Sequence, residues 1–324
     1  MDPLRAIADA VLYEGYVLWP YRRSALKNTR RFTFGGVYPP AHSDAHPDDP
    51  GGVQTQVLVE GGPDARLEVR VRFLHVVRRR LYRSGEPVDE LTVGGERHVS
   101  WEEATEREVT AEDLPVSELE RSVLLPIAIP AGREEEQLGE GTIVRTWHGL
   151  AGEVAMGAEP VGDDVHRLTV GVENRTPFAG RTREEALERT FCSTHTILRA
   201  RNGALVSAVD PPEALRAEVE ACRNEGTWPV LVGEPGERHT MLSSPIILDE
   251  YPRVAPESPG DLFDGGEIDQ LLTLNILSLT DEEKAEMRAS DPRAREILDR
   301  TEALTEEELM RLHGAIRDLR VVRP

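Results

Sequence analysis

The chain has 324 residues, of which 39 % are hydrophobic and 30 % are charged, a composition typical of a globular protein with a polar surface. With 38 basic and 59 acidic residues, its formal net charge is −21, which disfavours nucleic acid and anionic membranes as partners because such a surface repels them. Two cysteines indicate no disulfide framework, and neither a signal peptide nor a run of roughly 20 apolar residues is recognisable. We therefore expect a soluble, cytoplasmic protein.

Residues 1–52 are predicted to form a helix and then an aromatic and cationic segment packed on the body. Asp2-Pro3 is a typical helix start, and apolar residues follow at helical spacing as far as Gly15. No acidic residue occurs between Glu14 and Asp44. The basic side chains of this segment either pair with the protein's own carboxylates and aromatic rings or bind an anion or a partner. The second interpretation assigns that role to Trp19, Tyr21, Arg22, Arg23, Lys27, Arg30 and Arg31.

The segment from His42 to Gly52 reads as a solvated loop, because Pro, Gly and Asp dominate it. Its histidines and aspartates are possible metal contacts, but a Pro/Gly loop is rarely a preorganised site. A surface that orders on binding is the other interpretation.

Residues 53–248 are predicted to form a β-rich body. Val53–Glu60 and Leu67–Phe73 alternate apolar and polar residues, the latter continuing to Arg83, and the Gly61–Ala65 segment between them suggests a hairpin turn. A second hairpin is expected around Gly94-Gly95. The stretch from Glu102 to Asp113 reads as an acidic connector.

The second half of this body alternates strands with turns. Pro126 and Pro130 place the strand of residues 117–132 at a sheet edge or bulge, and residues 132–141 read as a solvated loop. Residues 142–162 and 165–178 are predicted strands. Thr182 with Glu185 forms a capping box for a short helix. Residues 191–210 suggest a hairpin across Asn202-Gly203, followed by a helix near 213–222 and a short buried strand at 227–233.

Residues 249–324 are predicted to form an ordered, acidic and Pro-rich wrap and then a helical tail. Apolar anchors such as Tyr251, Leu262 and Phe263 argue against a disordered linker. Cap signals predict helices near 281–289, 292–303 and 306–319. The fold class is α+β: a mostly antiparallel, sandwich-like β body with an N-terminal helix and a C-terminal set of short helices.

Few residues point to chemistry. Walker, dinucleotide-binding, HExxH, GxSxG and CxxC motifs are all absent from the sequence. Cys192 and His195, three residues apart on a strand, are expected to face opposite sides, as a core cysteine and a hydrogen-bonded histidine. A metal site is therefore not predicted. The residues whose types fit one without a recognised spacing are Cys192, His195, Cys222 and His239, together with the acidic Asp249, Glu250, Asp261, Asp264, Glu267 and Asp269.

Two long stretches, Tyr13–Pro39 (YEGYVLWPYRRSALKNTRRFTFGGVYP) and Met241–Arg288 (MLSSPIILDEYPRVAPESPG and onward), carry a resemblance. They resemble an uncharacterised bacterial family associated with gene clusters for nickel–iron hydrogenases, over about a quarter of the chain. The resemblance implies an accessory role in the assembly or maturation of that enzyme. It assigns no catalytic residue.

The sequence therefore predicts a non-catalytic accessory protein that needs no cofactor and binds a hydrogenase subunit or maturation factor. The alternative is a metal-dependent enzyme or metal carrier that uses carboxylate, histidine and cysteine side chains. A third interpretation joins the chain ends: the cationic segment 22–31 docks on the acidic segment 249–269, and both are structural.

Overall fold

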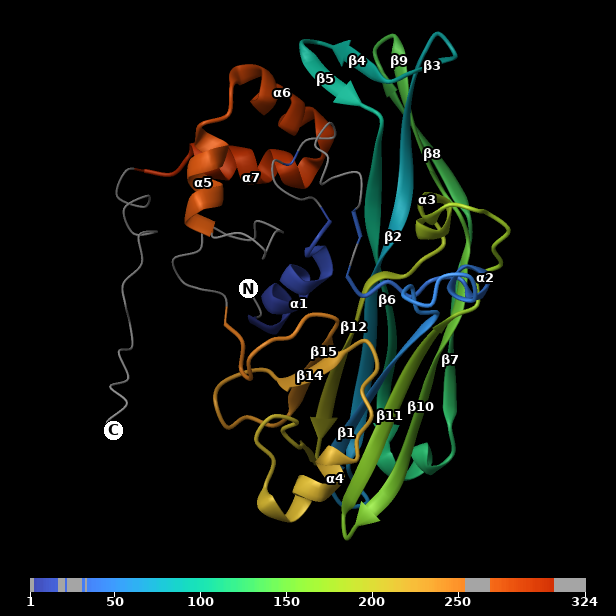
Figure 1. Ribbon diagram of the computed structural model, residues 1–324, viewed down its shortest axis with the longest axis vertical. Helices are drawn as coiled ribbons and strands as arrows, with labels where there is room; N and C mark the ends of the chain where they lie inside the picture. Colours follow the sequence, from blue (N-terminus) through green and yellow to red (C-terminus); the bar gives the residue numbers. More distant parts are fainter. Residues whose placement is uncertain (1–2, 17–20, 22–30, 33, 254–268, 306–324) are drawn as a thin grey trace.

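The computed structural model describes residues 3–16, 21, 31–32, 34–253 and 269–305. In this part of the chain, fifteen strands form two stacked antiparallel sheets and one small hairpin, with helices contributed by both ends of the chain (Figure 1). The predicted α+β class, with its antiparallel β body, N-terminal helix and short C-terminal helices, is confirmed.

The first sheet has five strands in the order β13-β1-β11-β10-β7, all antiparallel. Its strands are β1 (Gly52–Glu60), β7 (Val123–Ile129), β10 (Leu150–Gly162), β11 (Val165–Asn174) and β13 (Ala204–Leu205).

The second sheet has eight strands in the order β14-β15-β12-β2-β9-β8, with β3 and β6 also paired to β2. A separate hairpin joins β4 (Glu90–Val93) to β5 (Glu96–Val99) around Gly94-Gly95, as predicted. The strands of the second sheet are β2 (Arg66–Arg83), β3 (Glu86–Val88), β6 (Trp101–Pro115), β8 (Gly132–Leu138), β9 (Gly141–Trp147), β12 (Cys192–Arg201), β14 (Trp228–Leu231) and β15 (Thr240–Ser244).

Three of the described helices, α3, α6 and α7, begin at the capping residues that the sequence predicts. Capping boxes Thr182/Glu185 and Thr280/Glu283 precede α3 and α6, and Asp291 caps α7. The predicted helix at 306–319 lies outside the described residues. The α-helices are α1 (Pro3–Tyr13), α2 (Pro40–Ser43), α3 (Arg183–Leu187), α4 (Arg216–Glu220), α5 (Asp269–Leu277), α6 (Asp281–Ser290) and α7 (Pro292–Glu302), and the 3₁₀ turns are Val116–Glu120 and Glu213–Leu215.

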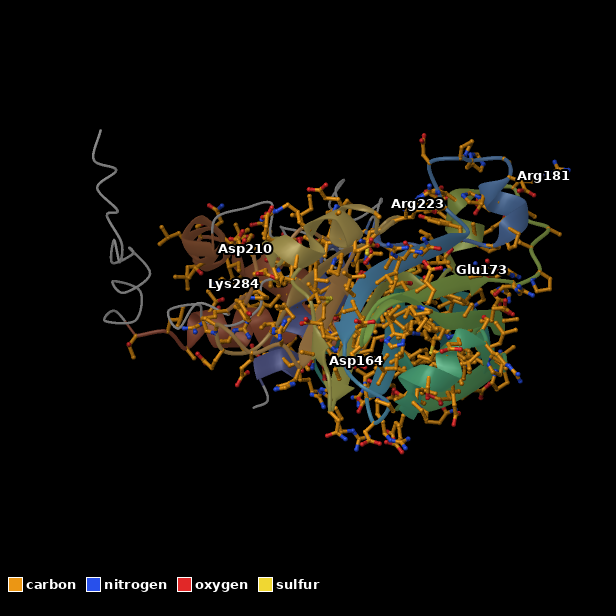
Figure 2. The ribbon with its side chains drawn as sticks, turned by 90° about the horizontal axis from the view of Figure 1, so that it is seen from below. Asp164, Glu173, Arg181, Asp210, Arg223 and Lys284 are labelled. Carbon is orange, nitrogen blue, oxygen red and sulfur yellow. The ribbon has the colours of Figure 1, made fainter. Side chains whose placement is uncertain are left out.

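The main core lies between the two sheets. Alternation along β2 turns Leu67, Val69, Val71 and Phe73 toward β1, β10 and β11, where they meet residues such as Val154 in one buried cluster. The opposite face of the eight-stranded sheet carries α1 and the C-terminal helices α5, α6 and α7. Figure 2 looks along the sandwich and shows the C-terminal helices on the far side of that sheet from β10 and β11, with Asp164 marking the β10–β11 turn.

Two buried clusters join the helices to this outer face. In the first, Leu4, Ile7 and Val11 of α1 pack on Ile197 of β12 and Leu242 of β15. The second, which we call the junction cluster, unites residues from both ends of the chain with the sheet: Leu12, Tyr13, Tyr16, Tyr21, Phe32, Tyr38, Leu74, Val76, Trp101, Ala186, Leu187, Cys192, Leu272, Ile276, Met287, Ala294, Ile297 and Leu298.

Two predicted hairpins are wrong. Gly61–Ala65 does not join paired strands, because β1 pairs with β11 and β13 whereas β2 pairs with strands of the other sheet. Asn202-Gly203 likewise carries the chain from β12 in one sheet to β13 in the other. Both are tight turns with turn-forming residues, but turn chemistry fixes only the reversal of direction and not the strand that each arm will pair with.

Two acidic stretches expected outside the sheets are strands. The predicted connector Glu102–Asp113 belongs to β6, which pairs with β2 over nearly its whole length, so that its glutamates lie beside the arginines of β2. The predicted loop 132–141 contains β8, which pairs with β9. By contrast, the edge position expected for the strand with Pro126 is confirmed, since β7 is the last strand of its sheet.

Candidate functional site

Five of the seven residues that the sequence assigns to a partner or anion site lie outside the described residues: Trp19, Arg22, Arg23, Lys27 and Arg30. Both remaining residues, Tyr21 and Arg31, are buried in the described structure. Tyr21 is in the left-handed backbone region at φ 56° and belongs to the junction cluster. These two side chains therefore face the interior of the protein.

Arg31 is held by aromatic rings and backbone carbonyls. Its guanidinium carbon lies 3.9 Å from the centre of the Trp101 ring and 4.7 Å from that of Tyr16. Its Nε donates to the Tyr16 carbonyl at 2.6 Å and its Nη1 to the Glu102 carbonyl at 2.7 Å. At this position, the interpretation that the cationic segment stacks on the protein's own aromatic rings agrees with the geometry.

Cys192 and His195 face the same side of β12, contrary to the expectation of opposite faces. A β-bulge separates them: Cys192 pairs with Leu74 and His195 with Arg72, so three steps along β12 match two along β2. Ser193 within the bulge has φ 53°. The extra residue reverses the alternation. Both side chains are buried, and desolvation raises the pKa of the Cys192 thiol to about 12, so this thiol stays protonated near neutral pH.

The other metal candidates are dispersed where they are described. Cys222 follows α4 and its Sγ contacts the Glu218 carbonyl, whereas His239 adjoins β15. Asp261, Asp264 and Glu267 lie outside the described residues. Within the described ranges, no three His, Cys, Asp or Glu side chains are grouped as metal ligands would be.

The loop after residue 42 is ordered around one buried histidine. His42 Nε2 lies 2.8 Å from Asp49 Oδ2, and its ring stacks on Tyr38 and contacts His46. His42 is thus part of the packing between this loop and the body, whereas residues 44–48 and 50 are exposed, in agreement with the predicted solvated loop.

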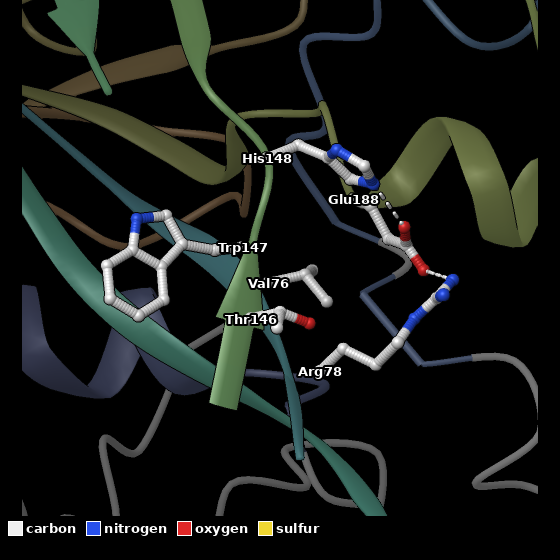
Figure 3. A pocket seen from close by; sticks show the side chains of 6 residues that line it. All are labelled: Val76, Arg78, Thr146, Trp147, His148 and Glu188. Atoms are coloured by element: carbon white, nitrogen blue, oxygen red, sulfur yellow. Dashed lines mark hydrogen bonds and ion pairs between the residues drawn. The ribbon is translucent and has the colours of Figure 1, made fainter. Parts of the chain in front are cut away.

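A small pocket lies where the eight-stranded sheet forks. β2 pairs with β12 as far as Leu74 and with β9 from Arg78 onward, so residues 75–77 have neither strand on that edge. At the same place the chain leaves β9 through His148 and enters the five-stranded sheet as β10. The resulting fork pocket of about 130 Å³ is lined by Val76, Arg78, Thr146, Trp147, His148 and Glu188 (Figure 3).

Glu188 is the central residue of a group of polar contacts in this pocket. Its buried carboxylate contacts the Arg78 guanidinium and lies 3.0 Å from His148 Nε2 (Figure 3), while Arg189 Nη2 lies 3.2 Å from His148 Nδ1. Because arginine is only a donor, Nδ1 accepts and Nε2 donates its proton to Glu188. Both imidazole nitrogens are therefore engaged, so in this arrangement the ring holds the end of α3 against β2 and β9 and offers no lone pair to a substrate.

A larger cleft, the α1 cleft, opens on the outer face of the sheet beside α1. It has a volume of about 540 Å³, within the range of ligand sites. Leu4 and Ile7 of α1 and Val232 after β14 give it apolar walls, and Arg199, Glu234 and Arg253 lie at its charged parts. Two smaller hollows of about 360 and 120 Å³ adjoin it and share Arg199 with it.

Sequence reasoning missed both the fork pocket and the α1 cleft. Their residues come from distant elements and form no linear motif. One signal was present: arginines alternate with apolar residues on β2 and β12, as in Arg70, Arg72, Arg199 and Arg201. These arginines lie on the polar face of the alternating strands, and α1 covers part of that face.

Among the described residues, no helix combines the length and the apolar character needed to cross a membrane. Comparison of the chain with protein-family models gives no match, and comparison with curated proteins gives none either.

Proposed function

We propose that the protein is a non-catalytic accessory protein that binds a partner protein. Following the resemblance of Tyr13–Pro39 and Met241–Arg288, the proposed partner is a subunit or maturation factor of a nickel–iron hydrogenase. The observation that carries the proposal is that these two stretches, about 200 residues apart, come together on one face of the eight-stranded sheet.

The two stretches contact each other directly. Gly35 has φ 55°, and a Cβ built on it would lie 2.6 Å from the Pro245 ring, so this close approach needs glycine. Tyr16 and Phe32 of the first stretch share the junction cluster with Leu272 and Met287 of the second. Such an assembly from remote segments is suited to present one composite surface to a partner.

Exposed apolar side chains support this location. Six large hydrophobic side chains are exposed among the described residues, and three of them belong to the two stretches: Phe34 at 40 %, Ile247 at 73 % and Leu274 at 46 %. The two stretches supply under a quarter of the sequence but half of these exposed side chains. They are therefore the first place to test for residues that anchor a partner.

The test is affinity purification of the tagged chain from its native host, followed by identification of bound proteins and elemental analysis. The wild-type chain is expected to recover a named hydrogenase subunit or maturation factor. Phe34→Ser and Ile247→Ser are expected to reduce that recovery at least about tenfold. Leu124→Ser and Val209→Ser, which change side chains that are 58 % and 65 % exposed but lie outside both stretches, are the matched controls and should leave it unchanged.

Two results would contradict the proposal. One is a chain that purifies alone with a stoichiometric transition metal, which would favour the metal-dependent alternative. The other is equal loss of partner in the control variants, which would place the binding face elsewhere.

A further inference from the structure

The imidazole of His148 in the fork pocket is held between one acceptor and one donor. The Glu188 carboxylate lies 3.0 Å from its Nε2 (Figure 3), and Arg189 Nη2 lies 3.2 Å from its Nδ1. Because arginine can only donate, Nδ1 accepts that hydrogen bond and Nε2 carries the ring proton. This pair of contacts fits only the neutral form of the ring.

Protonation of this ring breaks one of the two contacts. With a proton on Nδ1, the ring presents a donor to the donor of Arg189, and two positive charges face each other. The bond from Nε2 to Glu188 persists in the protonated form, where it becomes charge-assisted, so the contact to Arg189 is the one that is lost. The His148 side chain is 45 % exposed, which gives solvent protons access to it. Histidine in ordinary surroundings changes its charge between about pH 5 and 8.

Charged and titratable groups face His148 from two neighbouring elements. Glu188 and Arg189 follow α3, and Arg78 of β2 contacts the same Glu188 carboxylate. His75 of β2 lies beside His148, and burial lowers the pKa of His75 to about 4. A response of the folded chain between pH 7.5 and 5.5 is therefore not due to protonation of His75.

The backbone of Arg189 is tied to the first of the two stretches that form the proposed partner surface. One amide group, Nδ2 of Asn174, donates to the Arg189 carbonyl at 2.7 Å and to the Val37 carbonyl at 2.8 Å. Val37 N donates to the Phe191 carbonyl at 2.9 Å, and Phe191 N donates back to the Val37 carbonyl at 3.1 Å. A displacement of Arg189 is therefore transmitted to the segment that carries Phe34.

We propose that His148 is a proton-dependent switch that controls the position of residues 34–37. Protonation of the ring releases Arg189, which loosens the end of α3 and the backbone bonds between residues 34–37 and the start of β12. Acid therefore weakens binding of the partner at Phe34. The effect on the partner rests on the proposed function, whereas the release of Arg189 does not.

Hydrogen exchange of the purified full chain at pH 7.5 and 5.5 tests the switch. Protection factors, which correct for the intrinsic pH dependence of exchange, are compared between the wild type and His148→Gln, whose side chain stays uncharged at both pH values. On acidification, protection at residues 34–37 and 188–194 is expected to fall at least about fivefold further in the wild type than in this variant. β10 and β11 should respond equally in both proteins.

Two further variants separate the switch from other effects of acid. The amide of glutamine can donate to the neutral ring and accept from the protonated ring, so Arg189→Gln is also expected to remove the local response. His98→Gln, in the β4–β5 hairpin, is the matched control and should respond to pH as the wild type does.

Affinity purification at the two pH values tests the effect on the partner. Recovery with the wild type is expected to be at least about threefold lower at pH 5.5 than at pH 7.5, and recovery with His148→Gln to be nearly equal at both. Unchanged protection in the acidified wild type would overturn the switch, as would an equal loss of protection in His148→Gln. A local response of the wild type with no partner recovered at either pH would support the switch and contradict the proposed function.

Discussion

His75 and His195 are histidines held without charge inside the eight-stranded sheet. Burial, together with the positive charge of Arg107 beside His75 and of Arg72 beside His195, lowers the pKa of each imidazole to about 4. His195 Nδ1 lies 3.1 Å from the Ser193 carbonyl, and neither ring has a hydrogen-bond partner at Nε2 among the described residues. Both imidazole rings are therefore uncharged near neutral pH. Because the folded protein disfavours their protonated form, acid is expected to destabilise the fold.

The free energy of unfolding is expected to fall as the pH drops from about 6.5 to about 4. The unfolded chain binds protons on these histidines below pH 6.5, whereas the folded chain does not until about pH 4. Each ring contributes on the order of 3 kcal/mol across that window. Urea titrations at pH 7, 5.5 and 4.5 measure the slope. His195→Gln should flatten it, whereas His98→Gln, in the β4–β5 hairpin, should not, and equal slopes in both variants would contradict the assignment.

Two strand glycines in the same sheet differ in what surrounds them. A Cβ at Gly152 of β10 would lie 2.7 Å from the Phe191 ring and would also press on the Glu173 carbonyl, whereas a Cβ at Gly171 of β11 would meet nothing within 4 Å. Gly152→Ala is therefore expected to destabilise the protein by about 1–3 kcal/mol, and Gly171→Ala to change stability by less than about 1 kcal/mol. Thermal unfolding of the two variants measures the difference. Equal losses of stability in the two variants would show that the close contacts around Gly152 do not determine the cost of adding a Cβ.

At the scale of elements, β2 is the strand on which the rest of the molecule assembles. It pairs with β6, β12, β9 and β3, and its residues Leu67, Val69, Val71 and Phe73 fill the space between the sheets. Arg79 extends this role to the helices. Its buried guanidinium contacts Glu103 at 2.8 Å and donates to the carbonyls of Val99, Ala289 and Ser290, so that one side chain ties β2 to β6 and to the end of α6.

Arg79→Met is expected to lower the free energy of unfolding by about 3–5 kcal/mol, because it leaves the part-buried Glu103 carboxylate with one cation fewer and removes the arginine donor from three carbonyls. Hydrogen exchange should also become faster in α6 and α7 than in β10 and β11. Arg133→Gln, which removes an exposed arginine paired with Glu135, should change stability by no more than about 0.5 kcal/mol. A rate of hydrogen exchange in α6 that is the same in Arg79→Met as in the wild type would contradict the proposed role of Arg79 in holding α6 to β2.

At the scale of the whole molecule, the junction cluster connects parts that are remote in sequence. Residues from α1, β2, β6, α3, β12, α5, α6 and α7 share it, so neither end of the chain has a separate core in the described structure. Its position on the outer face of the eight-stranded sheet makes the C-terminal helices part of the body. The ends and the sheets should therefore unfold together.

Met287→Ala tests this coupling, since Met287 of α6 is fully buried in the junction cluster. The substitution is expected to cost about 2–5 kcal/mol and to lower the midpoint of one shared transition. Far-UV circular dichroism reports the secondary structure, and tryptophan fluorescence reports the four tryptophans, of which Trp101 lies inside the cluster; the two curves should coincide. A fluorescence transition that precedes loss of the strands would show that the helices form an independent unit.

The sequence by itself determined the local features of this protein. Alternation in Val53–Glu60 and Leu67–Phe73, the capping boxes at Thr182 and Thr280, and the proline that keeps β7 at an edge are all read within a few residues. Each depends on backbone geometry or on hydrogen bonds between near neighbours, which a short stretch of chain specifies alone.

Only the tertiary structure decided which strands pair and where polar side chains meet. Glu102–Asp113 becomes a strand because the arginines of β2 lie opposite its glutamates, and the turns at Gly61–Ala65 and Asn202-Gly203 lead into different sheets. The bulge at Ser193 turns Cys192 and His195 to one side, and packing of α1 over β12 creates the α1 cleft. These outcomes depend on contacts between residues tens to hundreds of positions apart, whose free energies no local pattern contains.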